Sequence, residues 1–151
     1  MLYQDYVGLK AEHGKEMAQK IIRFRLSHLQ QLLDVAEEEG LLGDSQARKV
    51  EAFDVFHDKK LFSQAKEWLR EYREDLPEES ANYKIYETPE ELEVCTVSIV
   101  ESKKVGMLNC IQSLQLSKPT IGCLSTIAGS VHPYRLVTGI LTRLLNSYHS
   151  Q

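Results

Sequence analysis

The chain has few cysteines, no long apolar run and no excess of positive charge, and each absence removes a class of protein. Three cysteines among 151 residues, with no CxxC pair, leave one thiol unpaired and favour a reducing compartment. No segment approaches the roughly 18 apolar residues that a membrane helix needs. The N-terminus also lacks the apolar core of a secretion signal. We therefore expect a cytoplasmic protein without a membrane span.

Sequence motifs that define a catalytic or binding site on their own are also missing. The net charge of -4 argues against nucleic acid or an anionic membrane as a partner. The five histidines form no HExxH motif and no pair four residues apart, so we predict no metal site. There is no GxSxG, no P-loop and no GxGxxG. Any function must therefore be inferred from the order of the elements.

Apolar residues with helical spacing dominate the first half of the chain. They predict a helix over Leu2–His13 and a longer one within Gly14–Glu39, which the glycines at 40 and 43 end. Asp58 is a good N-cap for a third helix, which Pro77 closes. The stripe expected on the long helix consists of Met17, Ile21, Phe24, Leu29, Leu32 and Val35.

Short β-rich segments separate these helices. We predict strands at Lys49–Phe56, Tyr83–Tyr86 and Thr120–Ile127, and a small helix that begins at Thr88-Pro89. A turn at residues 128–130 and a last helix within His132–Ser147 follow. The fold class is α+β and mostly helical, with strands too few and too far apart to form a sheet alone.

The His132-Pro133 step is the strongest local candidate for a site. Pro133 fixes the start of the last helix, and the small residues 128–130 before it let another group approach the backbone. Helix N-termini favour anions, and Arg135 can hold a carboxylate through its planar fork. The structural alternatives are a plain strand–turn–helix connection and, for Arg135, a salt bridge between helices. His132 and Arg135 are the candidate site residues.

The order of these segments resembles a known enzyme family. The stretches "LYQDYVGLKAEHG", "IIRFRLSHL", "LFSQAKEWLREYREDLPEES" and "STIAGSVHPYRLVTGILTRLL" are similar to fungal FAD-dependent oxidoreductases of the D-amino-acid oxidase and glycine oxidase class. Val131, Pro133, Arg135 and Leu136 match the V-x-P-x-R-L turn of that class. The resemblance covers residues 1–93 and 113–147.

The resemblance implies an enzyme that oxidises an amine or amino acid by hydride transfer to flavin. In that class a GxGxxG unit holds FAD, and a Gly-rich segment normally comes shortly before the residues with which this chain begins. Residues 1–151 are therefore expected to be a partial domain: the inserted helical part and the edge of the substrate domain. Alone, they are expected to be inactive and not to bind FAD. The native C-terminus is expected beyond Gln151, which leaves a peroxisomal signal open.

Two other interpretations of the whole chain stay open, and neither involves catalysis. In the first, the chain is a non-enzymatic helical interaction module. In the second, it is the product of a mispredicted gene. The fragment interpretation also implies apolar surface left uncovered on the last helix, at Ile140, Leu141, Leu144 and Leu145.

Residues Val94–Gln112 depart from the family pattern. Relatives run almost directly from "PEELE" into "LQLSKPTIG". The codons for Val94-Cys95 can form a splice donor, and those for Ile111-Gln112 can end in an acceptor. We hypothesise a retained, in-frame intron; a natural surface insertion is the alternative, because long loops are thermodynamically tolerable.

Overall fold

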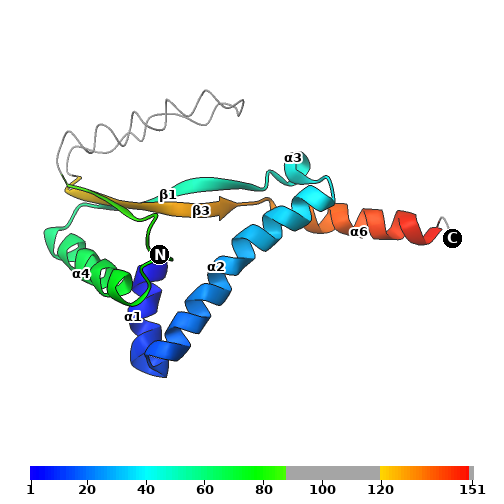
Figure 1. The fold of residues 1–151 in the computed structure, drawn as a ribbon. Coiled ribbons are helices and arrows are strands. Elements are labelled where there is room, and N and C mark those ends of the chain that lie inside the picture. Colours follow the sequence, from blue (N-terminus) through cyan, green and yellow to red (C-terminus); the bar gives the residue numbers. More distant parts are fainter. Residues whose placement is uncertain (88–119, 150–151) are drawn as a thin grey trace. The chain divides into compact units, whose positions relative to one another are not determined.

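The computed structural model describes residues 1–87 and 120–149 and has the expected α+β architecture, dominated by helices (Figure 1). The predicted helix at Thr88-Pro89 and the segment Val94–Gln112 lie outside the described residues. The elements are α1 (Leu2–His13), α2 (Lys15–Glu38), α3 (Leu42–Ser45), β1 (Arg48–Phe56), α4 (Lys59–Asp75), β2 (Lys84–Tyr86), β3 (Gly122–Ser130) and α6 (Pro133–His149).

Local signals in the sequence set the helix boundaries. Gly14 separates α1 from α2 with a φ of 79°, a conformation that glycine adopts without strain. The Asp58 carboxylate accepts hydrogen bonds from the backbone N–H groups of Lys60 (2.7 Å) and Leu61 (3.0 Å), and so caps α4 as predicted. α6 begins at Pro133 and runs two residues past the expected end at Ser147.

The strands form one sheet of order β1-β3-β2, so the expectation that they could not pair among themselves was wrong. β2 and β3 are antiparallel, with Lys84 opposite Ser125 and Tyr86 opposite Cys123. The predicted turn at residues 128–130 was also wrong, because these residues continue β3. Small side chains favour a turn locally, but backbone pairing with a distant strand is decided by the tertiary fold.

The described chain divides into two compact units. Unit 1 comprises Met1–Gly8 and Phe53–Thr126, and unit 2 comprises Leu9–Ala52 and Ile127–Gln151. Unit 1 buries large side chains from α1, α4 and the strands. Its buried apolar residues are Tyr3, Tyr6, Phe62, Ala65, Leu69, Tyr72, Leu76, Tyr83, Cys123 and Leu124.

Unit 2 has a smaller core made of short side chains. Ala36, Leu41, Ala47 and Leu136 form a buried cluster, against which Leu33, Val131 and Ile140 pack. The face that α2 buries differs from the expected stripe, since its buried residues are Ala18, Ile22 and Ala36. The expected stripe residues Met17, Phe24, Leu32 and Val35 are exposed.

Candidate functional site

The junction of β3 and α6 holds both candidate site residues and is fixed by backbone contacts to α3. The N–H group of His132 donates a hydrogen bond to the Ser45 carbonyl (2.7 Å), and the His132 carbonyl accepts from the Leu136 N–H (3.1 Å). Ser45 is buried, and its hydroxyl donates a hydrogen bond of 2.7 Å to the Leu41 carbonyl, four residues earlier in the chain. His132 therefore directly precedes α6 and ties the start of this helix to the end of α3, while its side chain is exposed.

Arg135 lies on the first turn of α6 and also reaches α3. Its Nη1 donates to the backbone carbonyl of Asp44 at 3.4 Å. The sequence left a choice between a ligand carboxylate and a salt bridge; the structure shows a contact with a backbone carbonyl instead. A carbonyl at the end of a short helix lacks a helical partner, and Arg135 satisfies it. His132 and Arg135 thus share one attachment point, and both side chains are solvent-accessible.

An apolar groove of about 220 Å³ lies next to this junction. Leu29 contacts the Gly129 backbone so closely that a Cβ on Gly129 would overlap the leucine side chain. A larger residue at position 129 would therefore force the Leu29 side chain to move within unit 2. The groove is lined by Leu29, Leu32, Leu33, Ala47, Gly129, Ser130 and Val131, none of them charged.

The described residues do not fit the pyrophosphate of FAD. That group is held by glycines in a turn that leads from a strand into a helix. The described glycines with positive φ are Gly14 and Gly40, which lie at the ends of α1 and α2. Gly129 is inside β3 and against Leu29. No cluster of three or more possible metal-ligating side chains is present in residues 1–87 and 120–149.

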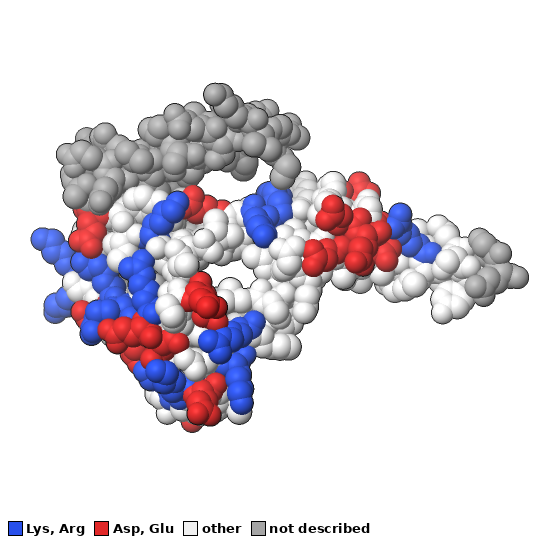
Figure 2. Space-filling view, in the orientation of Figure 1, with Lys and Arg blue, Asp and Glu red and all other residues white. Residues whose placement is uncertain are grey.

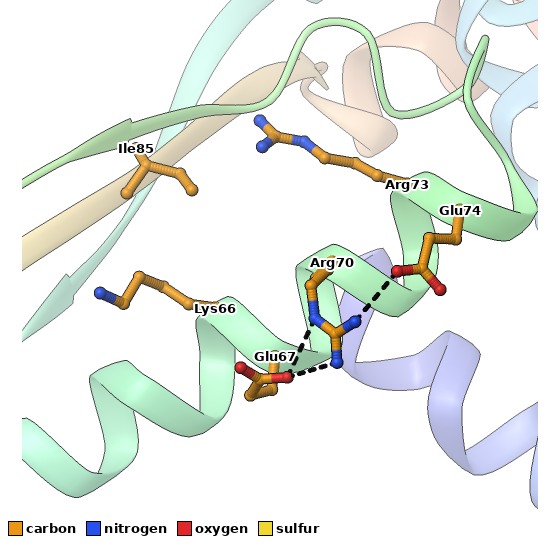
Figure 3. A pocket seen from close by; sticks show the side chains of 6 residues that line it. All are labelled: Lys66, Glu67, Arg70, Arg73, Glu74 and Ile85. Atoms are coloured by element: carbon orange, nitrogen blue, oxygen red, sulfur yellow. Dashed lines mark hydrogen bonds and ion pairs between the residues drawn. The ribbon is translucent and has the colours of Figure 1, made fainter.

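A second hollow, of about 450 Å³, lies on the surface of α4 and is rich in charge. Figure 3 shows Arg70 held between Glu67 and Glu74, at 2.7 and 3.0 Å, while Lys66 and Arg73 extend toward Ile85. The hydrogen bond to Glu67 raises the pKa of Arg70.

The other two cations of this hollow are also engaged within the chain. Lys66 pairs with Glu87 at 3.0 Å, and Arg73 donates to the Tyr83 carbonyl at 2.8 Å. Because every cation here already has a partner in the chain, the hollow is a poor site for an anionic ligand.

Four buried tyrosines form a cluster in unit 1. Tyr3 and Tyr72 each pack against Tyr83 in a T-shaped arrangement, with 5.8 Å between ring centres in both pairs. The fourth ring, that of Tyr6, contacts Tyr72 at 5.5 Å. The Tyr3 hydroxyl donates to Asp54 (2.9 Å). The Tyr6 hydroxyl donates to Asp75 (2.7 Å).

The environment of these rings keeps the phenols protonated. Burial, followed by the hydrogen bond to Asp54, raises the pKa of Tyr3. Burial also raises the pKa of Tyr72, and it raises that of Tyr83 to about 12. The Tyr72 hydroxyl has no hydrogen-bond partner among the described residues. Sequence analysis missed this cluster, although Tyr3 and Tyr6 lie three residues apart on one helical face, as core residues do.

Comparison with known proteins identifies no family for this chain. No protein-family model matches the chain, and no curated protein or solved structure shows detectable similarity to it. Within the described ranges, every helix is too short or too polar to cross a lipid bilayer. The candidate site is therefore supported by its own geometry.

Proposed function

We propose that this chain is part of an FAD-dependent oxidoreductase that oxidises an amine or an amino acid by hydride transfer to flavin. One observation carries the proposal. The segment "STIAGSVHPYRLVTGILTRLL" folds as a strand, a two-residue connection and a helix that begins at Pro133. The resemblance to the D-amino-acid oxidase class implies a turn and a helix here, at Val131, Pro133, Arg135 and Leu136, and the helix that begins at Pro133 supports it.

The contribution of this chain is architectural rather than chemical. His132 and Arg135 attach the β3–α6 connection to α3 through the Ser45 and Asp44 carbonyls. Both side chains are exposed at this attachment, so they are the candidates to line a substrate site. No hydride-transfer step is assigned to the residues of this chain, because the described part does not fit the cofactor.

The test is a flavin titration of two proteins. The 151-residue chain alone should leave FAD fluorescence unquenched. A longer chain, extended by the GxGxxG unit expected upstream and lacking Val94–Gln112, should be yellow and should oxidise an amine or amino acid. Saturable micromolar binding of FAD by the short chain would overturn the assignment as a partial domain. A longer reading frame that contains no GxGxxG would overturn the oxidoreductase itself.

Transcript sequencing tests the segment Val94–Gln112 separately. Spliced messenger RNA that lacks these codons supports the intron hypothesis. A dominant messenger RNA that keeps them supports a natural insertion, which leaves the proposed oxidoreductase unaffected.

A non-enzymatic interaction module is the second candidate, and the surface of α6 favours it. Leu141, Leu144 and Leu145 are exposed, as the sequence implied, whereas Ile140 packs against the core of unit 2 and was wrongly expected at the surface. Flavin binding by the longer chain would decide against the module as the sole function.

A further inference from the structure

The outer face of α6 carries an apolar stripe with the spacing of a coiled coil. We call it the α6 stripe. Five of its members follow one another at alternating intervals of three and four residues, Leu145 flanks this series, and all six are between 50% and 74% exposed. This is the a/d pattern of a helix that packs along a second helix. The stripe consists of Tyr134, Val137, Leu141, Leu144, Leu145 and Tyr148.

The adjoining face of the same helix is already used within unit 2. Leu136 is buried, and Ile140 packs against the same cluster. Gly139 lets the helix approach Leu41, since a Cβ there would lie 2.8 Å from the leucine methyl carbons. A surface helix of a globular protein normally has one apolar face. The apolar face of α6 is unusually wide, and the described part of the chain covers only the portion around Leu136 and Ile140.

Charge on α6 lies away from the stripe and is engaged within the chain. Arg135 contacts the Asp44 carbonyl, and Arg143 pairs with Glu39 at 3.2 Å. In Figure 2 the outer part of α6, at the right of the view, is mostly white. A strongly charged partner would find no complementary charge on the stripe. The partner that matches it is another apolar helix face.

The stripe can pair with the same stripe on a second copy of α6. In an antiparallel helix pair the a positions of one helix face the d positions of the other. Taking Tyr134, Leu141 and Tyr148 as a positions places Leu141 opposite Leu144 and Val137 opposite Tyr148. Tyr148 then meets the smaller Val137, the arginines stay outside the seam, and the helix dipoles oppose each other. We propose that two copies of this chain associate through the α6 stripe, with the two helices antiparallel.

The exposed area is sufficient for such a contact. In this register Tyr134 has no counterpart on the second α6, because the position opposite it lies past His149. The other five side chains, at half to three-quarters exposure, amount to about 500 Å² on each copy if a tyrosine exposes about 200 Å² in full. Burying them on both copies would remove about 1,000 Å², which is typical of weak protein–protein contacts. The expected dimer is therefore weak and concentration-dependent.

The experiment is sedimentation equilibrium of the full 151-residue chain across a wide concentration range. We expect a monomer–dimer equilibrium. Leu141→Glu should weaken it by at least about 100-fold, because the carboxylate would be buried against Leu144 of the second copy. Thr142→Glu adds the same charge to the neighbouring exposed position off the stripe, and should leave the equilibrium unchanged. Far-UV circular dichroism checks that both variants keep their helices.

A mixing experiment tests the antiparallel register. The Leu141→Glu chain and the Leu144→Lys chain should each be monomeric, and their mixture should form a heterodimer because the new charges face each other. A parallel pair would place each new charge opposite a leucine, so no heterodimer would form and the register would be wrong. A monomeric parent chain, or association that survives Leu141→Glu, would overturn the interface. This readout needs no flavin, so it is independent of the proposed oxidoreductase.

Discussion

Unit 1 and unit 2 bury their apolar side chains to very different degrees. Unit 1 encloses four tyrosines together with Phe62, Leu69 and Leu124. The central cluster of unit 2 contains two alanines and two leucines. Among the described residues, Leu61 is the large exposed apolar side chain of unit 1, and the others belong to unit 2. Among the described residues, unit 1 therefore covers its large apolar side chains more completely than unit 2 does.

This difference decides where a partner is needed. Apolar area removed from water stabilises a fold by roughly 25 cal/mol per Å², and unit 2 leaves much of that area in water. Both proposals concern this surface. In the proposed oxidoreductase, further elements of the same enzyme would cover the exposed apolar surface of unit 2. In the proposed dimer, a second copy of the chain would cover the α6 stripe.

The largest expected effect is a cavity in the core of unit 1. Leu69→Ala should lower the free energy of unfolding by about 2–5 kcal/mol, because Leu69 is fully buried and its neighbours cannot fill the space. Leu61→Ala on the same helix is the control, and should stay within about 0.5 kcal/mol since that side chain is 59% exposed. Trp68, the single tryptophan, lies in unit 1 and reports its urea unfolding by fluorescence. Equal effects of the two substitutions would contradict the described core.

Alkaline pH should destabilise unit 1 next most strongly. The pKa values of Tyr3, Tyr72 and Tyr83 are raised in the folded chain, so the unfolded chain loses these protons first as pH rises. Stability is complete below about pH 10, the ordinary tyrosine pKa, and falls as pH increases toward the folded values. Tyrosinate absorbance of these three rings should appear together with the Trp68 unfolding transition. Their ionisation well before unfolding would show that the cluster is open to water.

Two glycine-to-alanine exchanges compare a packed helix position with an open one. Gly8 has no atom within 4 Å of an added Cβ, so Gly8→Ala should stabilise the chain by about 0.5–1 kcal/mol through helix propensity. Gly139→Ala brings the same propensity but meets Leu41 at 2.8 Å. We expect it to be about 1–2 kcal/mol less stable than Gly8→Ala, because overpacking strains the core of unit 2. Circular dichroism of thermal unfolding measures both, and an equal gain in stability would disprove the close approach of α6.

The smallest effect is expected from the ion pair of unit 2. Arg143→Ala removes the 3.2 Å contact with Glu39, and both side chains are well exposed to solvent. The loss of unfolding free energy, measured by urea titration, should not exceed about 0.5 kcal/mol and should disappear in high salt, because exposed ion pairs are screened. Arg143→Lys is the matched control, since it keeps the positive charge and should lose less than Arg143→Ala. A loss that persists in concentrated salt would indicate that the aliphatic part of Arg143 packs against unit 2.

The candidate site could be located from the sequence, but its contacts could not. His132-Pro133 marks the start of α6 because proline fixes φ and needs no backbone donor there. That the His132 N–H and the Arg135 guanidinium both meet the end of α3 depends on the pairing of distant segments, since Asp44 and Arg135 are 91 residues apart. No local pattern carries that information. The tyrosine cluster escaped prediction for the same reason, since Tyr83 is far from Tyr3 in the chain.

By itself the sequence determined where α2, α4 and α6 begin, whereas it did not indicate the short helix α3. Residues next to one another supply those signals: the positive φ of Gly14, the Asp58 carboxylate on two N–H groups, and Pro133 at the start of α6. Only the tertiary structure decided which face of α2 is buried. Met17 and Ala18 are both apolar, as are Ile21 and Ile22, so the helical spacing allows two adjacent faces. Ala18 and Ile22 are the ones buried, because burial is set by what packs against the helix and not by the helix alone.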